Sequence, residues 1–377
     1  MPSLQASGVL SLFTELAAIP SPSGKELPVA ERVTKELRDL GLDVDIDDSG
    51  SRVGSDTGNL FTRLEPNGGS GGTPIFFCAH LDTVVPTAPI EPVVEDGIVR
   101  NSAGTILGAD NKAAVAAMLE AVRRILLEGR PHAGVELVFT TREESGCQGA
   151  KAFDAGRLRA RAGFVYDHAA PIGDVVIAAP HQRRIDVRFL GRAAHAGINP
   201  EDGRSAIHAA ARAIADLRLG RLDEETTANV GVIAGGTARN VVPERCSFEV
   251  DTRSRNEGKL LELVEEMLAT FAFAAAISDC EVETVVDELY RGYRLSMDDP
   301  ALRLAFAGLE AAGFAPRGVE VGGGADANIF NAQGVPCVVL ANGMAHIHSP
   351  DEQIAVADLE ARVGVTLAIV DSARDAA

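Results

Sequence analysis

Apolar residues follow two alternating patterns in the first part of the chain. Short continuous apolar runs bounded by turn-forming residues predict buried strands at 75–79, 135–140 and 163–166. Apolar residues at helical spacing predict helices over 26–40 and 112–127, and the second is apolar on nearly every side. Strands that alternate with helices in this way indicate an α/β sheet with crossover connections.

A different pattern occupies residues 181–291. Its order is strand, helix, strand, strand, helix, strand, which is the split β-α-β arrangement. The predicted elements span 183–190, 204–217, 228–234, 246–253, 258–276 and 281–288. The earlier pattern then resumes, with a helix over 300–311 and a buried strand over 335–341. We therefore predict an α/β domain formed by 1–180 and 292–377, into which a smaller domain, 181–291, is inserted.

Composition narrows the class of protein. A chain of 377 residues is too long for one ordinary compact core, which agrees with two domains. The formal net charge of −19 argues against a nucleic-acid partner and against docking on an anionic membrane. The five cysteines include no CxxC pair, so neither a disulfide framework nor a zinc knuckle is indicated. Without a signal-like N-terminus or a long apolar run, we predict a cytoplasmic protein.

Five short segments carry the carboxylates and imidazoles that a site for two metal ions needs. They are residues 78–82, 108–112, 142–146, 166–168 and 346–350. Several of them directly follow a predicted strand, and ligands in α/β sheets gather beyond the carboxyl ends of the strands. We therefore expect their acidic and imidazole side chains to converge on one cleft.

Taken singly, these segments also have simpler explanations. His80 and Asp82 form a His-x-Asp motif, in which the carboxylate can accept the second N–H of the imidazole, but so short a motif is weakly specific. Asp110 opens a helix and is also explained as a plain N-cap. The adjacent Glu143 and Glu144 are also explained as solvated loop residues, although neighbouring carboxylates are best tolerated beside a cation.

The last two segments, 166–168 and 346–350, also do not identify a metal ligand by themselves. Asp167 stands at the end of a predicted strand, where it repeats the pattern. His346 and His348 are both candidates for one metal position, and the residues alone do not choose between them. No other metal, serine-nucleophile or phosphate-loop motif offers a rival site. Cys147 lies beside the glutamates without a histidine partner that the sequence places, so we expect a packing residue.

Together the five segments resemble the co-catalytic zinc exopeptidases, the family of peptidase T, carboxypeptidase G, acetylornithine deacetylase and succinyl-diaminopimelate desuccinylase. The resemblance covers nearly the whole chain. It implies a catalytic domain with a mixed sheet flanked by helices, and it implies that the insert is a lid or dimerisation domain. It also implies two Zn²⁺ per subunit, for which Co²⁺ or Mn²⁺ can substitute, and a short peptide or amide as the substrate.

The resemblance also assigns roles at the metal site. It implies five metal ligands, which are His80, Asp110, Glu144, Asp167 and His348. Asp110 bridges the ions, His80 and Asp167 complete the first site, and the other two ligands complete the second. Asp82 is implied to orient His80, and Glu143 is implied to be the general base. His346 is left as a neighbour, and the bond between Asp110 and Asn111 is typically cis in this family.

Four further positions match substrate-binding residues of the family. His195 is implied to be an oxyanion donor that often reaches in from a dimer mate, so the insert allows a homodimer. From the residues alone, His195 is better explained as a solvated hairpin residue. Asn240 and Arg253 match substrate contacts. Gly324 lies in a glycine-rich loop that permits close backbone approach to a substrate.

Two features indicate the branch of the family. Asp167 stands where the carboxypeptidase and desuccinylase branches usually carry Glu, and residues 141–151 are similar to the peptidase T-like group. The segment from Gly324 to Asp326 departs from peptidase T, which usually has a bulkier residue before this aspartate. We predict a peptidase T-like aminopeptidase that acts on short peptides. The alternatives are an N-acyl amino acid deacylase or carboxypeptidase of the same family, or a catalytically silent binding protein with substituted ligands.

Overall fold

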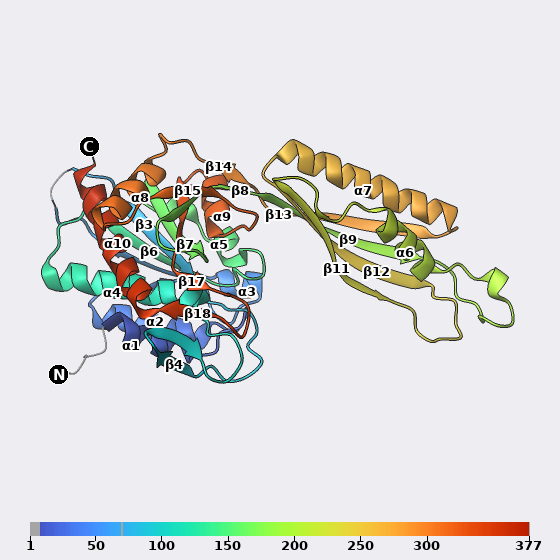
Figure 1. The fold of residues 1–377 in the computed structure, drawn as a ribbon, viewed down its shortest axis with the longest axis horizontal. Helices are drawn as coiled ribbons and strands as arrows, with labels where there is room; N and C mark the ends of the chain where they lie inside the picture. The colour runs from blue at the N-terminus through green and yellow to red at the C-terminus, as the bar shows by residue number, and fades with distance from the viewer. Residues whose placement is uncertain (1–7, 69–70, 377) are drawn as a thin grey trace. The chain divides into compact units, whose positions relative to one another are not determined.

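The computed structural model describes residues 8–68 and 71–376 and divides into two compact units (Figure 1). The small unit comprises Ala178–Tyr293 and Val321–Gly324. The large unit comprises the chain up to Ile177, then Arg294–Glu320 and Ala325–Ala377. The small unit therefore begins and ends within a few residues of the predicted insert, and it also includes a short glycine-rich segment from much later in the chain.

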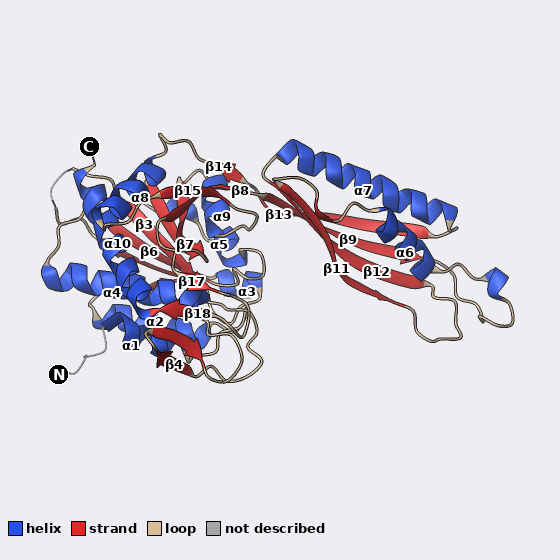
Figure 2. Ribbon diagram, viewed as in Figure 1, coloured by secondary structure: helices blue, strands red, loops and turns tan. Residues whose placement is uncertain are grey.

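The large unit is built on a mixed sheet with strand order β1-β2-β6-β3-β7-β16-β8-β14, and β15 pairs with β8 (Figure 2). The strands are β1 (Asp45–Ile46), β2 (Leu60–Leu64), β3 (Ile75–His80), β6 (Val135–Thr140), β7 (Ala162–His168), β8 (Asp174–Ala179), β14 (Tyr293–Arg294), β15 (Arg317–Glu320) and β16 (Cys337–Ala341). Strand β3 runs parallel to both β6 and β7, and β16 runs parallel to β7. The carboxyl ends of these four strands therefore meet at one edge of the sheet.

Helices bury both faces of the central strands. The helices of the large unit are α1 (Gly8–Ala17), α2 (Leu27–Asp39), α3 (Ser49–Val53), α4 (Ala109–Glu128), α5 (Gln148–Ala152), α8 (Pro300–Ala311), α9 (Asp326–Ala332) and α10 (Val356–Asp375). Helix α4 packs against β3 and β7 on one side and against α1 and α10 on the other, which explains its apolar residues all round. Phe76 of β3 contacts Phe330 of α9, whereas the next residue, Phe77, belongs to the core that includes α4.

A second, small sheet in the large unit has the order β17-β18-β5-β4. Its strands are β4 (Pro92–Glu95), β5 (Ile98–Asn101), β17 (Met344–Ala345) and β18 (Gln353–Ala355). Strands β17 and β18 flank the predicted segment 346–350, so both ends of that segment are held by sheet hydrogen bonds to antiparallel partners.

The small unit has its own antiparallel sheet, with strand order β10-β11-β12-β9-β13 (Figure 2). Its elements are β9 (His181–Leu190), α6 (Ala206–Asp216), β10 (Gly220–Arg221), β11 (Thr226–Gly235), β12 (Arg245–Ser254), α7 (Glu257–Ile277) and β13 (Glu281–Tyr290). Apart from the short β10, these elements follow the order that the sequence predicts. Both helices pack on β9 and β12, and they enclose a separate apolar core.

The predicted fold class, a mixed α/β sheet flanked by helices, is confirmed. Within the described residues, none of the helices combines the length and apolar character that a membrane crossing requires.

The close packing of the central sheet can be tested by adding a methyl group at Gly163. A Cβ atom on Gly163 of β7 would lie 2.1 Å from Cε1 of Phe76, which is fully buried. Gly163→Ala should therefore lower the free energy of unfolding by about 1–3 kcal/mol, the usual cost of overpacking. Urea denaturation followed by circular dichroism measures it. The matched control is Gly364→Ala in α10, where a Cβ would meet no neighbouring side chain within 4 Å. This substitution should raise the free energy of unfolding by up to about 1 kcal/mol, because alanine favours a helix over glycine. Equal stability of the two variants would contradict the packing argument.

Candidate metal centre

The first group of candidate ligands forms where two parallel strands end. His80 is the last residue of β3, and Asp167 lies near the end of the neighbouring β7. The His80 Nε2 atom lies 3.2 Å from Oδ1 of Asp110 and 3.5 Å from Oδ1 of Asp167. The side chains of His80 and Asp110 are buried, so this imidazole and these carboxylates meet away from solvent.

The second group shares Asp110 with the first. The His348 Nε2 atom lies 2.8 Å from Oε1 of Glu144 and 3.2 Å from Oδ2 of Asp110. Each carboxylate oxygen of Asp110 thus faces a different imidazole, which is the arrangement of a carboxylate between two cations. Both C-terminal histidines are exposed, but the structure brings only His348 to this cluster, and His346 belongs to none of the candidate ligand groups among the described residues.

The backbone around Asp110 aims its side chain at the cluster. Gly108, just before α4, has a φ of 73°, the left-handed conformation that glycine adopts without strain. Asp110 itself has non-helical dihedral angles inside α4, and the bond to Asn111 is cis, as the resemblance implies. Both carboxylate oxygens face imidazoles, so the plain N-cap explanation does not describe this aspartate.

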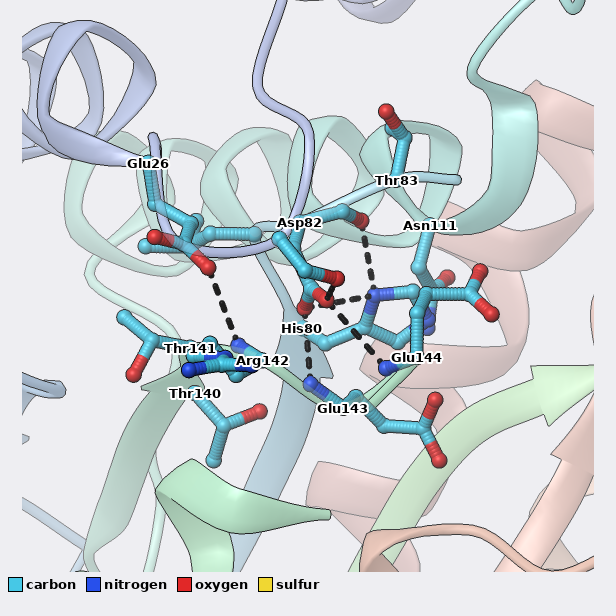
Figure 3. A network of polar contacts seen from close by, with 12 residues as sticks. Glu26, His80, Asp82, Thr83, Asn111, Thr140, Thr141, Arg142, Glu143 and Glu144 are labelled. Carbon is cyan, nitrogen blue, oxygen red and sulfur yellow. Dashed lines mark hydrogen bonds and ion pairs between the residues drawn. The ribbon is translucent and has the colours of Figure 1, made fainter. Parts of the chain in front are cut away.

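Asp82 binds the loop that carries the glutamates (Figure 3). Its carboxylate accepts the backbone N–H of Glu143 at 2.9 Å and that of Glu144 at 3.2 Å, and it accepts the hydroxyl of Ser23 at 2.5 Å. His80 Nδ1 lies 2.9 Å from the carbonyl oxygen of Asp82 and 3.5 Å from its carboxylate. The carbonyl is therefore the closer partner of the imidazole, and the carboxylate positions the glutamates.

Glu143 lies within the same cluster. Its carboxylate, His80 and Glu144 offer atoms that all lie within 4.8 Å of one another. The buried Cys147 donates its S–H to Oε1 of Glu143 at 3.3 Å, so this residue contacts the carboxylate as well as packing. Burial raises the pKa of Glu143 well above its usual value, and the charge of Asp167 raises it further.

The electrostatics of the cluster favour added positive charge. Burial, together with the negative charges of Asp110 and Glu144, raises the pKa of Asp167 to about 8. Burial acts in the same direction on Asp110, but hydrogen bonds with His348 and His80 outweigh it and lower its pKa. Hydrogen bonds to Asp110 and Glu144 raise the pKa of His348 to about 10. The imidazoles act here as the counter-charges of the buried carboxylates, a role that divalent cations fill more effectively.

The donor types fit such cations. Imidazole nitrogen and carboxylate oxygen are the ligands that zinc-class ions take in proteins. Among the described residues, four groups of candidate ligands have atoms within 4.8 Å of one another, and two of these groups contain Asp110: one with His80 and Asp167, the other with Glu144 and His348. Since Asp110 belongs to both groups, the residues fit a pair of ions that share one carboxylate.

The small unit brings together two of the predicted substrate residues. His195 and Val241 form an isolated antiparallel bridge, and Ala196 donates its N–H to the carbonyl of Asn240 at 2.9 Å. His195 and Asn240 therefore lie on adjoining loop segments. Both residues are exposed in the structure, so their side chains are accessible.

Arg253 and Gly324 have partners within the small unit. The Arg253 guanidinium pairs with Asp251, with Nε 2.9 Å from Oδ1, and its Nη1 lies 3.5 Å from the carbonyl of Gly322 in the glycine-rich loop. A Cβ on Gly324 would lie 2.2 Å from the ring of Tyr290. The absence of a side chain at Gly324 is thus required by a ring of the protein itself, a reason that the sequence does not reveal.

Three buried acids near the cluster are not found by the sequence reasoning. Glu26 accepts the backbone N–H of Arg142 at 3.1 Å, and Glu352 accepts backbone N–H groups of the turn before α4 (Figure 3 shows the first of these). Asp326 accepts the hydroxyl of Thr140 at 2.5 Å. Glu352 lies four residues after His348, and Asp326 lies beside the glycine-rich loop, and this proximity is the only signal that the sequence offers.

Comparisons with known proteins agree with this geometry. Residues 76–372 match the peptidase family M20/M25/M40. The chain is 36% identical over 365 residues to the uncharacterized protein YqjE of Bacillus subtilis strain 168, covering 97% of this chain and 98% of that protein. It is also similar to two crystal structures, each covering 98% of this chain and 99% of the other chain. These are aminopeptidase PepT from Bacillus cereus ATCC 10987, with 36% identity and a TM-score of 0.87, and a tripeptidase from Staphylococcus aureus, with 32% identity and a TM-score of 0.91.

The family match and the full-length similarity to two peptidases show a metal-dependent hydrolase that acts on peptides. The chain belongs to the peptidase family M20/M25/M40, and the resemblance drawn from its sequence is confirmed.

The two neighbouring histidines provide a matched test of the second group. His348→Ala should bind one metal ion in place of two, because it removes the imidazole that faces Asp110 and Glu144. His346→Ala should retain both ions, because this side chain is exposed and outside the candidate groups. Metal analysis by mass spectrometry after dialysis gives the stoichiometry. Loss of an ion from the His346 variant alone would reverse the assignment.

Proposed function

We propose that this protein is a metal-dependent exopeptidase of the aminopeptidase type, peptidase T-like, that acts on short peptides. The observation that carries the proposal is the position of Asp110 between His80 and His348. The full-length similarity to an aminopeptidase and to a tripeptidase, at 36% and 32% identity, supports the same activity. The donor set favours Zn²⁺, and Co²⁺ or Mn²⁺ have the same ligand preferences.

The ligands in this proposal are those of the two groups around Asp110. When bound, the ions lower the pKa of a water molecule and polarise the scissile carbonyl. Glu143 accepts the proton of the attacking water and delivers it to the leaving amine. The carboxylate of Asp82 keeps Glu143 in place by accepting the backbone N–H of Glu143. The thiol of Cys147 fixes one oxygen of the Glu143 carboxylate, which leaves the other free for the proton.

The small unit supplies the remaining groups in this proposal and serves as the lid and dimerisation domain. His195 stabilises the oxyanion, a contribution on the order of 3 kcal/mol per donor, and Asn240 contacts the substrate beside it. Arg253 binds a substrate carboxylate, for which a planar guanidinium is suited. Exposed apolar side chains on its sheet, among them Val232 and Ile233, support a homodimer. A cytoplasmic location stays a prediction.

The assignment of Glu143 has a direct test. Glu143→Gln should lower kcat by about 10²–10⁴-fold, the usual contribution of a positioned acid–base group. It should retain both metal ions, because the carboxylates and imidazoles of the two ligand groups are unchanged. Steady-state kinetics with a tripeptide, together with metal analysis, measure both quantities. Full activity in this variant would remove Glu143 from the mechanism.

The end of the peptide that the enzyme requires is tested with blocked substrates. Tripeptides with a free N-terminus should be cleaved, and N-acetylation should abolish cleavage, as expected for an aminopeptidase. Mass spectrometry of the products identifies the bond that breaks. Cleavage that survives N-acetylation but not C-terminal amidation would instead indicate the deacylase or carboxypeptidase alternative. No hydrolysis of a broad peptide panel by fully metal-loaded protein would indicate the silent binding protein.

A further inference from the structure

We propose that Glu352 is a positioning residue. It fixes the position of Asp110 relative to His348 and thereby sets the affinity for the second metal ion. The inference rests on the proposed function, since it concerns the same pair of ions. It goes further by assigning a role to a buried acid that is outside the ligand groups.

The contacts of Glu352 all converge on the turn that carries Asp110. One carboxylate oxygen, Oε2, accepts the backbone N–H of Leu107 at 2.8 Å and that of Gly108 at 2.9 Å. The other, Oε1, accepts the backbone N–H of Asp110 at 2.9 Å. Glu352 is only 2% exposed, so water does not compete for these bonds. A single side chain therefore binds the turn through both of its oxygens.

The turn needs this partner because of its conformation. Gly108 has a left-handed backbone conformation, and Asp110 departs from helical dihedral angles. The backbone N–H groups at the start of α4 therefore do not follow regular helical geometry. Buried N–H groups must find an acceptor within the protein. Glu352 supplies this acceptor for the N–H groups of Leu107, Gly108 and Asp110.

Glu352 also belongs to the segment that provides His348. Asp110 is thus contacted twice by residues 348–352, at its N–H by Glu352 and at its Oδ2 by His348 Nε2, 3.2 Å away. The next residue, Gln353, begins β18 and pairs with Arg100 of β5, which holds the end of the segment in a sheet. Movement of the turn relative to this segment would change the separation of the two groups that face the second ion.

An isosteric amide cannot replace this carboxylate. Glutamine has one acceptor oxygen, and its NH₂ group only donates. In Glu352→Gln, either the N–H pair of Leu107 and Gly108 or the N–H of Asp110 would face a donor. Residues that orient metal ligands in this way typically change metal affinity by about 10–100-fold when they are replaced.

The chain offers a matched control in Glu136 of β6. It is also 2% exposed, and it also accepts backbone N–H groups, from Arg159 at 3.0 Å and from Ala160 at 2.9 Å. It lies near the start of β6, whereas the candidate ligands follow the strand ends. Glu136 also pairs with Arg63, 2.6 Å away, so Glu136→Gln removes a buried loop anchor and an ion pair away from the metal centre.

The experiment measures metal binding directly. Metal-free wild type, Glu352→Gln and Glu136→Gln are titrated with Co²⁺ by calorimetry, and folding is verified by circular dichroism. Wild type and Glu136→Gln should bind two ions alike. Glu352→Gln should bind the second ion about 10–100-fold more weakly. Its kcat for a tripeptide should fall and recover as Co²⁺ is raised, with KM unchanged.

The outcomes separate the two proposals. Wild-type affinity for both ions in Glu352→Gln, or an equal loss in Glu136→Gln, would overturn the role of Glu352 and leave the proposed function intact. Fewer than two ions in wild type would overturn the proposed function itself. If Glu352→Gln does not fold, Glu352→Asp takes its place, because the shorter side chain keeps the charge but withdraws it from the turn. Wild-type affinity in that variant would likewise overturn the assignment.

Discussion

The carboxylate of Asp110, with one oxygen toward each imidazole, is the interaction on which the rest of the site depends. A buried carboxylate is costly unless opposite charge and hydrogen bonds surround it. Here the parallel strands β3 and β7 place His80 and Asp167 on one side of Asp110, and the loop after β6 together with the segment before β18 places Glu144 and His348 on the other. The sheet order therefore determines which ligands can share this aspartate.

Buried acids that bind backbone amides hold the surrounding loops. Asp82 binds the N–H groups of Glu143 and Glu144, Glu26 binds that of Arg142, and Glu352 binds three in the turn before α4. Each of these loops carries a candidate ligand or the proposed general base. Hydrogen bonds to charged acceptors are directional and stronger than neutral ones, so the loops are fixed in orientation as well as in position.

The sequence predicts the parts of the protein that depend on periodic patterns. Continuous apolar runs predict the buried strands, and the acids that follow them are the residues that converge, such as Asp167. Glu26 and Glu352 escape prediction because their partners are backbone amides, which leave no side-chain pattern. The choice of His348 over His346 requires the family resemblance or the fold. The membership of Val321–Gly324 in the small unit has no local signal, because it arises from a long-range return of the chain.

The position of β16 has a consequence for biosynthesis. This strand enters the sheet between β7 and β8, although it follows the whole small-unit segment Ala178–Tyr293 in the chain, and His348 and Glu352 come after it. A nascent polypeptide emerging from the ribosome thus has the first ligand group long before it has the second. Non-local pairing of this kind delays completion of the native state. The second group of candidate ligands therefore cannot assemble until the chain has been synthesised through His348.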